Sequence, residues 1–239
     1  MEYPPVPTLT AGDVQVWWAR RETVADWHHD LLDPAERERQ EALHRQDDRD
    51  SFVVGCALLR QVAAGHLRIA PDAVRVHRGC ADCGRPHGKT RVDGLHLSLS
   101  HSGQWVVVAV SRTLELGIDI EHRSSMQDAD SVARLVLSAA EYGVYLRTPE
   151  QARARLLLNY WVGKEAVLKA TGDGLRVPLQ ELTLADPSGS PRVVAWVRRP
   201  ELAARITLHK VGRERRHAAC LAVIGRPARV VELDLPGPR

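Results

Sequence analysis

The stretch Gly117-Ile118-Asp119-Ile120-Glu121 decides what fold and what chemistry this chain of 239 residues can support. Two carboxylates alternate with two isoleucines, and successive side chains of a β-strand point to opposite faces. The pattern therefore predicts a strand with Asp119 and Glu121 on one face and both isoleucines buried on the other. Two hard oxygen ligands side by side suit a Mg²⁺ ion that carries a phosphate ester. Taken alone, the same pair would also suit the solvent-facing side of an edge strand.

A second group of charges lies in Trp161-Val162-Gly163-Lys164-Glu165, and Lys169 follows four residues after Glu165. The spacing of apolar residues predicts a helix over 152–170, which places Glu165 and Lys169 one turn apart on the same edge. Such a pair supplies a general base and a cation for phosphate oxygens. The simpler interpretation is an exposed ion pair that contributes about 0.3 to 0.5 kcal/mol. Lys164 falls within the apolar stripe, where a lysine can snorkel to water.

Composition excludes several classes of protein. Hydrophobic residues make up 44% of the chain and charged residues 26%, which is typical of a soluble globular protein rather than a membrane protein. The formal net charge of +3 suits an anionic ligand but is too small to indicate nucleic acid. No signal peptide is visible at the start, and the four cysteines do not resemble a secreted disulfide framework. We therefore expect a protein of the reducing cytoplasm.

The order of predicted elements indicates an α+β protein built from two comparable halves, 1–112 and 113–239. The first half contains a strand over 14–18, helical sequence over 34–67 that begins with Asp33 as N-cap, and strands over 95–99 and 105–110. The second half begins with the strand over 114–120. It continues with helical sequence over 131–146, where Ser138 and Glu141 have capping-box spacing, and over 152–170. Strands are expected over 182–184, 192–197, 206–210 and 218–224, followed by an irregular tail over 225–239.

The motifs GIDIE and WVGKEAVLK, in this order, resemble the paired motifs of the large, Sfp-like class of 4'-phosphopantetheinyl transferases. Gly88-Lys89-Thr90 and the segment 97–102 are similar to two further segments of that family, and a weaker similarity covers 33–60. The resemblance implies a pseudo-twofold arrangement of two similar α+β halves, with coenzyme A and the active site in the cleft between them. It also implies transfer of the 4'-phosphopantetheine arm of coenzyme A to a serine of an acyl or peptidyl carrier protein, with release of adenosine 3',5'-bisphosphate.

The resemblance assigns roles to individual residues. Asp119, Glu121 and Glu165 match the acids that bind Mg²⁺, and Glu165 is also the base that takes the proton of the serine hydroxyl. Lys169 matches the lysine that stabilises charge on the departing bisphosphate. The contacts to coenzyme A are expected from Lys89, Ser100, His101 and Arg49, with Arg49 on the 3'-phosphate. Arg60 matches a family arginine that can equally be structural.

The expected partners are coenzyme A and a small acidic helical carrier protein, with no nucleic acid and no membrane, and the protein itself is expected to be a monomer. The segment 123–137 after the acidic strand offers a docking surface. Its apolar side chains are Met126, Val132, Leu135 and Val136, and Arg123 and Arg134 supply positive charge for acidic partners.

Two other functions remain open at this point. His77, Cys80, Cys83 and His87 could bind zinc, although the set is compressed into eleven residues, and a zinc-dependent binding module would follow. Alternatively, the same acids could serve a Mg²⁺-dependent phosphohydrolase. That enzyme would release phosphate from coenzyme A without any acceptor protein.

Overall fold

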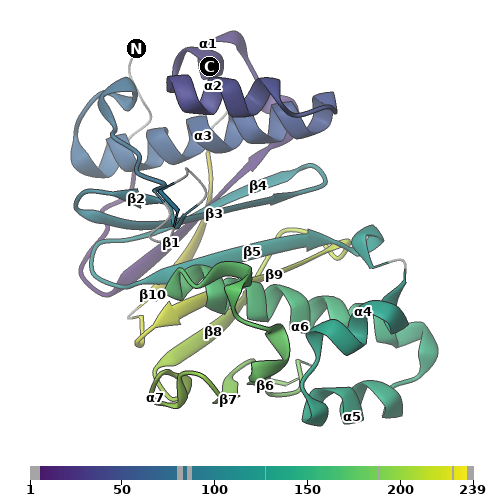
Figure 1. Cartoon of the computed structure of the whole chain (residues 1–239). Coiled ribbons are helices and arrows are strands. Elements are labelled where there is room, and N and C mark those ends of the chain that lie inside the picture. Colours follow the sequence, from purple (N-terminus) through teal and green to yellow (C-terminus); the bar gives the residue numbers. More distant parts are fainter. Residues whose placement is uncertain are drawn as a thin grey trace. The chain divides into compact units, whose positions relative to one another are not determined.

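The computed structural model describes residues 6–79, 83–84, 88–126, 128–187, 189–227 and 229–235 (Figure 1). The chain divides into two compact units. One runs to Leu114 and also includes the segment from Pro227 onward, and the other is Glu115–Arg226. Each unit packs a long helix on a β-sheet whose sequential strands are antiparallel, so the expected α+β class is confirmed. No helix of the described residues is long and apolar enough to cross a membrane.

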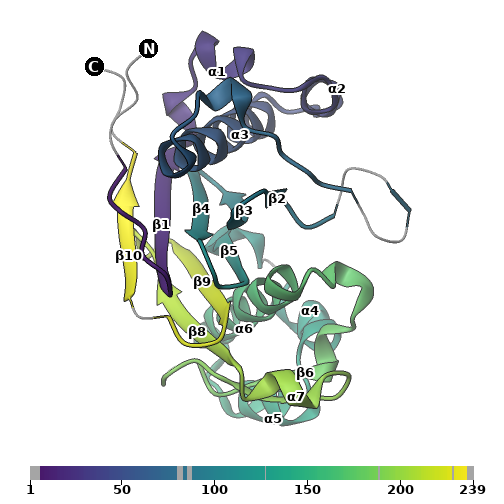
Figure 2. The ribbon, with the colours of Figure 1, turned by 90° about the vertical axis from the view of Figure 1, so that its left-hand side faces the viewer.

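The first unit is built on a five-stranded sheet in the order β10-β1-β4-β3-β2. Its strands are β1 (Asp13–Arg20), β2 (Arg91–Val92), β3 (Leu95–Ser102), β4 (Trp105–Ser111) and β10 (Arg229–Asp234). Its helices are α1 (Asp26–Asp30), α2 (Pro34–Glu41) and α3 (Gln46–Leu67), with short 3₁₀ turns η1 (Arg21–Thr23) and η2 (Pro71–Ala73). Figure 2 shows α3 lying across one face of this sheet.

Hydrophobic alternation explains how α3 packs on the sheet. Leu97 on β3 and Val106, Val108 and Val110 on β4 point to one face, where they share a core with the apolar side of α3. The predicted N-cap of the preceding helix is confirmed, because the Asp33 carboxylate accepts a hydrogen bond from the backbone N–H of Glu36 at 2.9 Å.

The prediction of an irregular tail is wrong for residues 229–234. This segment forms β10, which pairs in parallel with β1 at the edge of the first sheet (Figure 2). The side chain of Glu232 accepts a hydrogen bond from Trp18 Nε1 at 3.0 Å, which ties the strand to its neighbour. Of the three prolines in the tail, Pro227 precedes the strand, where a missing N–H removes no ladder hydrogen bond, and the other two lie outside the described residues.

The second unit is built on a three-stranded sheet in the order β5-β9-β8, with a separate hairpin of β6 and β7. Its strands are β5 (Leu116–His122), β6 (Leu182–Leu184), β7 (Val193–Trp196), β8 (Ile206–Val211) and β9 (His217–Ile224). Its helices are α4 (Ala129–Val136), α5 (Ala139–Arg147), α6 (Glu150–Thr171) and α7 (Pro200–Ala203), with 3₁₀ turns η3 (Arg123–Ser125), η4 (Gly174–Arg176) and η5 (Leu179–Glu181). Helix α6 packs on β5 and β9.

The helical sequence expected over 131–146 is divided into α4 and α5 by an extended residue, Leu137. Helix α5 begins at the predicted capping box, in which the backbone N–H of Ser138 donates to the Glu141 carboxylate at 2.7 Å. This confirms the N-terminus that the Ser138 and Glu141 spacing indicated.

A buried ion pair joins α5 to α6. Lys164 is 0% exposed and Glu141 1% exposed, and Lys164 Nζ donates to a Glu141 carboxylate oxygen at 2.5 Å. The ammonium also donates to the carbonyl oxygens of Val136 and Leu179, at 2.7 and 2.9 Å. Three acceptors satisfy its three protons, so the idea that Lys164 snorkels to water is wrong. Burial, partly offset by Glu141, lowers the pKa of Lys164.

Removing one partner of this pair should be costly. We expect Lys164→Met to lower the free energy of unfolding by about 3 to 5 kcal/mol, because the Glu141 charge is left buried and unpaired. The double variant Lys164→Met/Glu141→Gln should be less destabilised than Lys164→Met alone, since no isolated charge remains. Urea unfolding followed by circular dichroism measures both.

The matched control is the exposed pair between Arg198 and Glu181, whose closest nitrogen and oxygen atoms are 3.0 Å apart. Arg198→Met should cost much less than Lys164→Met, because an exposed ion pair contributes little to stability. A loss for Lys164→Met as small as that of the control would show that the buried pair does not hold the helices together.

Candidate active site

The position of the acidic strand is set by a glycine. A Cβ atom placed on Gly117 would lie 2.2 Å from the carbonyl oxygen of Ala166 and 2.3 Å from the amide nitrogen of Ala170. Only glycine therefore lets the backbone of α6 lie directly against β5. Because side chains alternate along a strand, Asp119 and Glu121 point to the same, helix-facing side as position 117.

This contact brings the two charged motifs together. Lys169 Nζ donates to the Asp119 carboxylate at 2.6 Å. Asp119 is 4% exposed, so the alternative of a solvent-facing acid on an edge strand is wrong for this residue, although β5 is an edge strand of its sheet. The Lys169 side chain keeps 31% of its surface exposed. A partly exposed cation held beside a buried carboxylate is suited to binding a phosphate group.

Glu165 lies in the same charge cluster. Its Oε1 atom is buried and accepts no hydrogen bond from any described residue. The pKa of Glu165 is raised from 4.5, first by burial and then by the negative charges of Asp119 and Glu121, while Lys169 lowers it. A raised pKa moves the carboxylate toward the range where it can accept a proton near neutral pH. Glu165 therefore has the environment of a general base.

The residues fit a divalent metal ion in their chemistry. Three carboxylates supply hard oxygen ligands, and the buried Oε1 atom of Glu165 has an unused acceptor position. The described residues, however, contain no group of three His, Cys, Asp or Glu side chains already converged as a metal site. Lys169 bonds to one oxygen of the Asp119 carboxylate. The assignment of Asp119, Glu121 and Glu165 to Mg²⁺ stays a prediction.

The residues expected to contact coenzyme A all belong to the first unit. Ser100 and His101 are neighbours on β3, with Ser100 buried and His101 exposed, and Lys89 is half-buried just before β2. Arg49 lies in the first turn of α3, and its Nε donates to the carbonyl oxygen of Leu43 at 2.7 Å. Part of that guanidinium therefore holds the link between α2 and α3. The coenzyme A contacts of these four residues stay predictions.

Arg60 has a structural role in this unit. It is 3% exposed and pairs with the buried Glu36 at 2.8 Å and with Asp33 at 3.3 Å. Arg78 also pairs with Glu36. Of the two interpretations that the sequence left open for Arg60, this network supports the structural one.

Two other predictions have different outcomes. Of the four residues considered for zinc, Cys80 and His87 lie outside the described residues, so the zinc hypothesis is not tested.

The predicted docking surface on 123–137 is partly wrong, because Met126 and Val136 are 7% and 1% exposed and pack in the core of the second unit. Leu135 is exposed, and Arg134 stacks over the ring of Tyr142 at 5.4 Å.

Sequence reasoning missed two features that position the site. The glycine of the acidic motif was not recognised as a contact point, although a glycine next to an acidic strand signals a close backbone approach. The partner of Lys164 was also missed, because Glu141 lies 23 residues away on another helix. One oxygen of Glu141 accepts hydrogen bonds from both Ser138 and Lys164. Its second oxygen in fact accepts a hydrogen bond from the backbone N–H of Leu184 at 2.7 Å.

Comparison with known proteins places the chain in a family. The model of the 4'-phosphopantetheinyl transferase superfamily matches residues 115–222, and the model of the N-terminal part of 4'-phosphopantetheinyl transferases matches residues 17–113. A 4'-phosphopantetheinyl transferase of Nostoc sp., HetI, is 30% identical over 203 residues, which cover 81% of this chain and 84% of HetI. The transferase Sfp of Bacillus subtilis is 26% identical over 157 residues, 64% of this chain and 66% of Sfp.

These matches define a transferase, and the predicted resemblance is confirmed. The chain belongs to the 4'-phosphopantetheinyl transferase family and is an enzyme of that class.

The contact at Gly117 gives a first test of the site. Gly117→Ala should separate β5 from α6, because its Cβ meets backbone atoms that cannot rotate away. We expect destabilisation of roughly 1 to 3 kcal/mol and loss of enzymatic activity. The matched control is Gly143→Ala on α5, whose Cβ would meet only the flexible end of Arg147, at 3.5 Å. That change should leave activity intact and stabilise the helix by up to about 1 kcal/mol. Equal behaviour of the two variants in unfolding and activity would contradict the close approach.

The raised pKa of Glu165 gives a second test that does not depend on activity. A carboxyl with a raised pKa binds its proton more tightly in the folded than in the unfolded state. Its contribution to stability therefore falls as pH rises from about 4.5 through the raised pKa. We expect Glu165→Gln to unfold at a higher urea concentration than the wild type at pH 7, with the difference vanishing below pH 4.5.

Mg²⁺ should raise the melting temperature of the wild type more than that of Glu165→Gln, because the ion compensates a charge that the variant lacks. Glu201→Gln, at an exposed position of α7, is the control and should match the wild type throughout. If Glu165→Gln were no more stable than the wild type at pH 7, the folded protein would not disfavour the ionised form of Glu165, and its pKa would not be raised.

Proposed function

We propose that this enzyme transfers the 4'-phosphopantetheine arm of coenzyme A to a serine of an acyl or peptidyl carrier protein. The reaction depends on Mg²⁺ and releases adenosine 3',5'-bisphosphate. The observation that carries the proposal is the meeting of the two family motifs at one point, where Lys169 bonds to Asp119 and both acidic residues of β5 raise the pKa of Glu165.

The residues of this site supply the parts that the reaction needs. Glu165 accepts the proton of the serine hydroxyl as the serine oxygen forms a bond to the β-phosphorus of coenzyme A. The bond from that phosphorus to the bridging oxygen breaks, and its electron pair leaves with the bisphosphate. Lys169, accessible at the edge of the site, stabilises the negative charge that grows on this leaving group.

Asp119, Glu121 and Glu165 would hold the Mg²⁺ ion, and their mutual repulsion would be relieved by it. The bound ion would neutralise charge on the pyrophosphate of coenzyme A. Lys89, Ser100, His101 and Arg49 are proposed to bind the remainder of coenzyme A.

The setting of the reaction is part of the proposal. Cys56 and Cys220 are buried free thiols, which suits the reducing cytoplasm. We propose that the protein acts there as a monomer that activates carrier proteins, including those of secondary-metabolite biosynthesis.

The direct test is mass spectrometry of an apo carrier protein incubated with the enzyme, coenzyme A and Mg²⁺. We expect the mass of one phosphopantetheine to be added. In single-turnover transfer at saturating coenzyme A, Glu165→Gln should be slower by roughly two or more orders of magnitude, because a positioned proton acceptor is lost. Lys169→Ala should lower the rate more than it weakens coenzyme A binding, since the charge it opposes grows toward the transition state.

The acid side of the pH profile should distinguish Glu165 from other groups. The wild-type rate should fall with decreasing pH as Glu165 is protonated, and this limb should be absent from Glu165→Gln. Glu201→Gln is again the control. Near wild-type rates for both Glu165→Gln and Lys169→Ala would refute these roles. Release of phosphate from coenzyme A without a carrier protein would instead favour a phosphohydrolase.

A further inference from the structure

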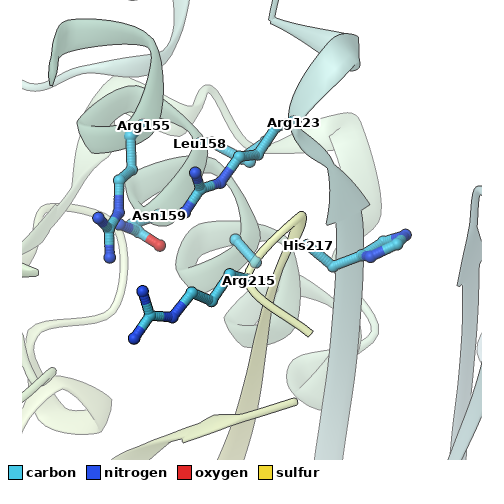
Figure 3. Close-up of a pocket in the computed structure, with 7 residues that line it drawn as sticks. Arg123, Arg155, Leu158, Asn159, Arg215 and His217 are labelled. Carbon is cyan, nitrogen blue, oxygen red and sulfur yellow. The ribbon is translucent and has the colours of Figure 1, made fainter. Parts of the chain in front are cut away.

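A basic pocket lies in the second unit, at the end of β5. Its volume is about 460 Å³, and its lining includes Arg123, Arg155, Arg215 and Asn159 over a floor of Leu158 and Ala218. The three guanidinium groups and the Asn159 side chain are directed toward one space, whereas the ring of His217 points away from it (Figure 3). The arginines come from three separate places, η3, α6 and the turn between β8 and β9, so only the fold brings them together.

The lining of this arginine pocket carries positive charge and no negative charge. The side chains of Arg123, Arg155 and Arg215 make no ion pair with any residue that the structure describes, and no acidic residue lines the pocket. Three positive charges in one pocket equal the formal net charge of the whole chain, +3. Clustered like charges repel one another unless an anion lies between them. The pocket is therefore suited to bind negative charge.

The arginine pocket lies close to the catalytic residues but is separate from them. Arg123 follows Glu121 by two residues at the end of β5. Arg155 precedes Glu165 by ten residues on α6, which is about 15 Å along the helix axis. A protein whose serine reaches Glu165 must cover the neighbouring surface, and a distance of about 15 Å is within the width of a small helical domain.

The exposure of the arginines indicates what kind of anion binds. All three are solvent-exposed, and only Leu158 among the lining residues named here is buried. A small anion held by this surface would keep most of its contact with water, so the arginines could grip it only weakly. A docked protein with carboxylates on its surface would associate faster, because the arginines attract it, and would bind more tightly, because several carboxylates can contact the arginines at once.

We infer that the arginine pocket receives acidic side chains of the carrier protein while its acceptor serine lies at Glu165. This inference rests on the proposed function, since it takes the carrier protein as the partner. It also moves the docking surface from the apolar residues of 123–137, two of which are buried, toward Arg155 and Arg215 on α6 and the β8–β9 turn.

The test uses charge reversal at the two arginines that are farthest in sequence from the acidic strand. Binding of a fluorescently labelled apo carrier protein is measured by anisotropy for the wild type, Arg155→Glu, Arg215→Glu and the double variant. Each single reversal should weaken binding roughly three- to thirtyfold at low salt, and the double variant should lose most of the salt dependence that the wild type shows. In transfer assays the Michaelis constant for the carrier should rise, while kcat and the Michaelis constant for coenzyme A stay within about twofold.

The control is Arg192→Glu, an exposed arginine beside β7 that does not line the pocket, which should bind the carrier like the wild type. A carrier variant with lysine in place of acidic residues near its acceptor serine should bind the glutamate variants better than the unaltered carrier does. Unchanged affinity of Arg155→Glu and Arg215→Glu would overturn the inference, and so would a rise in the Michaelis constant for coenzyme A alone. The anisotropy measurement needs no transfer, so it tests the pocket even if the proposed reaction fails.

Discussion

The close approach of α6 to β5 at Gly117 is the constraint on which the candidate site depends. With no side chain at this position, the backbone of the helix touches the strand, and a Cβ would lie 2.2 Å from the Ala166 carbonyl oxygen. The strand pleat then directs Asp119 and Glu121 toward the helix, and the helix period places Glu165 and Lys169 opposite them. Any side chain at position 117 would move α6 away from β5, and the charged residues of the two elements would no longer form one site.

The helix is held in this position by a second interaction. The buried pair of Lys164 and Glu141 links α6 to α5, and further hydrogen bonds extend it to Val136, Leu179 and Leu184. Lys164 is adjacent to Glu165 in the sequence, so the residue that anchors the helix and the residue proposed as base are fixed together. A buried ion pair contributes little net stability compared with apolar packing, but an incomplete one is strongly destabilising. The pair therefore favours one position of α6 over displaced ones.

The second unit has two charged regions, an acidic one at β5 and a basic one in the arginine pocket. At the acidic strand, Lys169 compensates only part of the negative charge, and Glu165 has a raised pKa as a result of burial and its acidic neighbours. In the arginine pocket, positive charge is left without an anion among the described residues. The first region favours a cation and a phosphate, and the second favours carboxylates on a partner.

The sequence by itself determined the α+β class, the strand and helix that carry the charged motifs, the caps at Asp33 and Ser138, and the family resemblance, because each depends on local periodicity or on residues close in the chain. Tertiary structure decided the rest. The tail became β10 because β1 offered an unpaired edge, which no local pattern reveals. Lys164 found Glu141, 23 residues away, and Arg123, Arg155 and Arg215 converged from three elements. Contacts between residues that are far apart in the sequence depend on how the helices and strands pack, so only the folded structure identifies them.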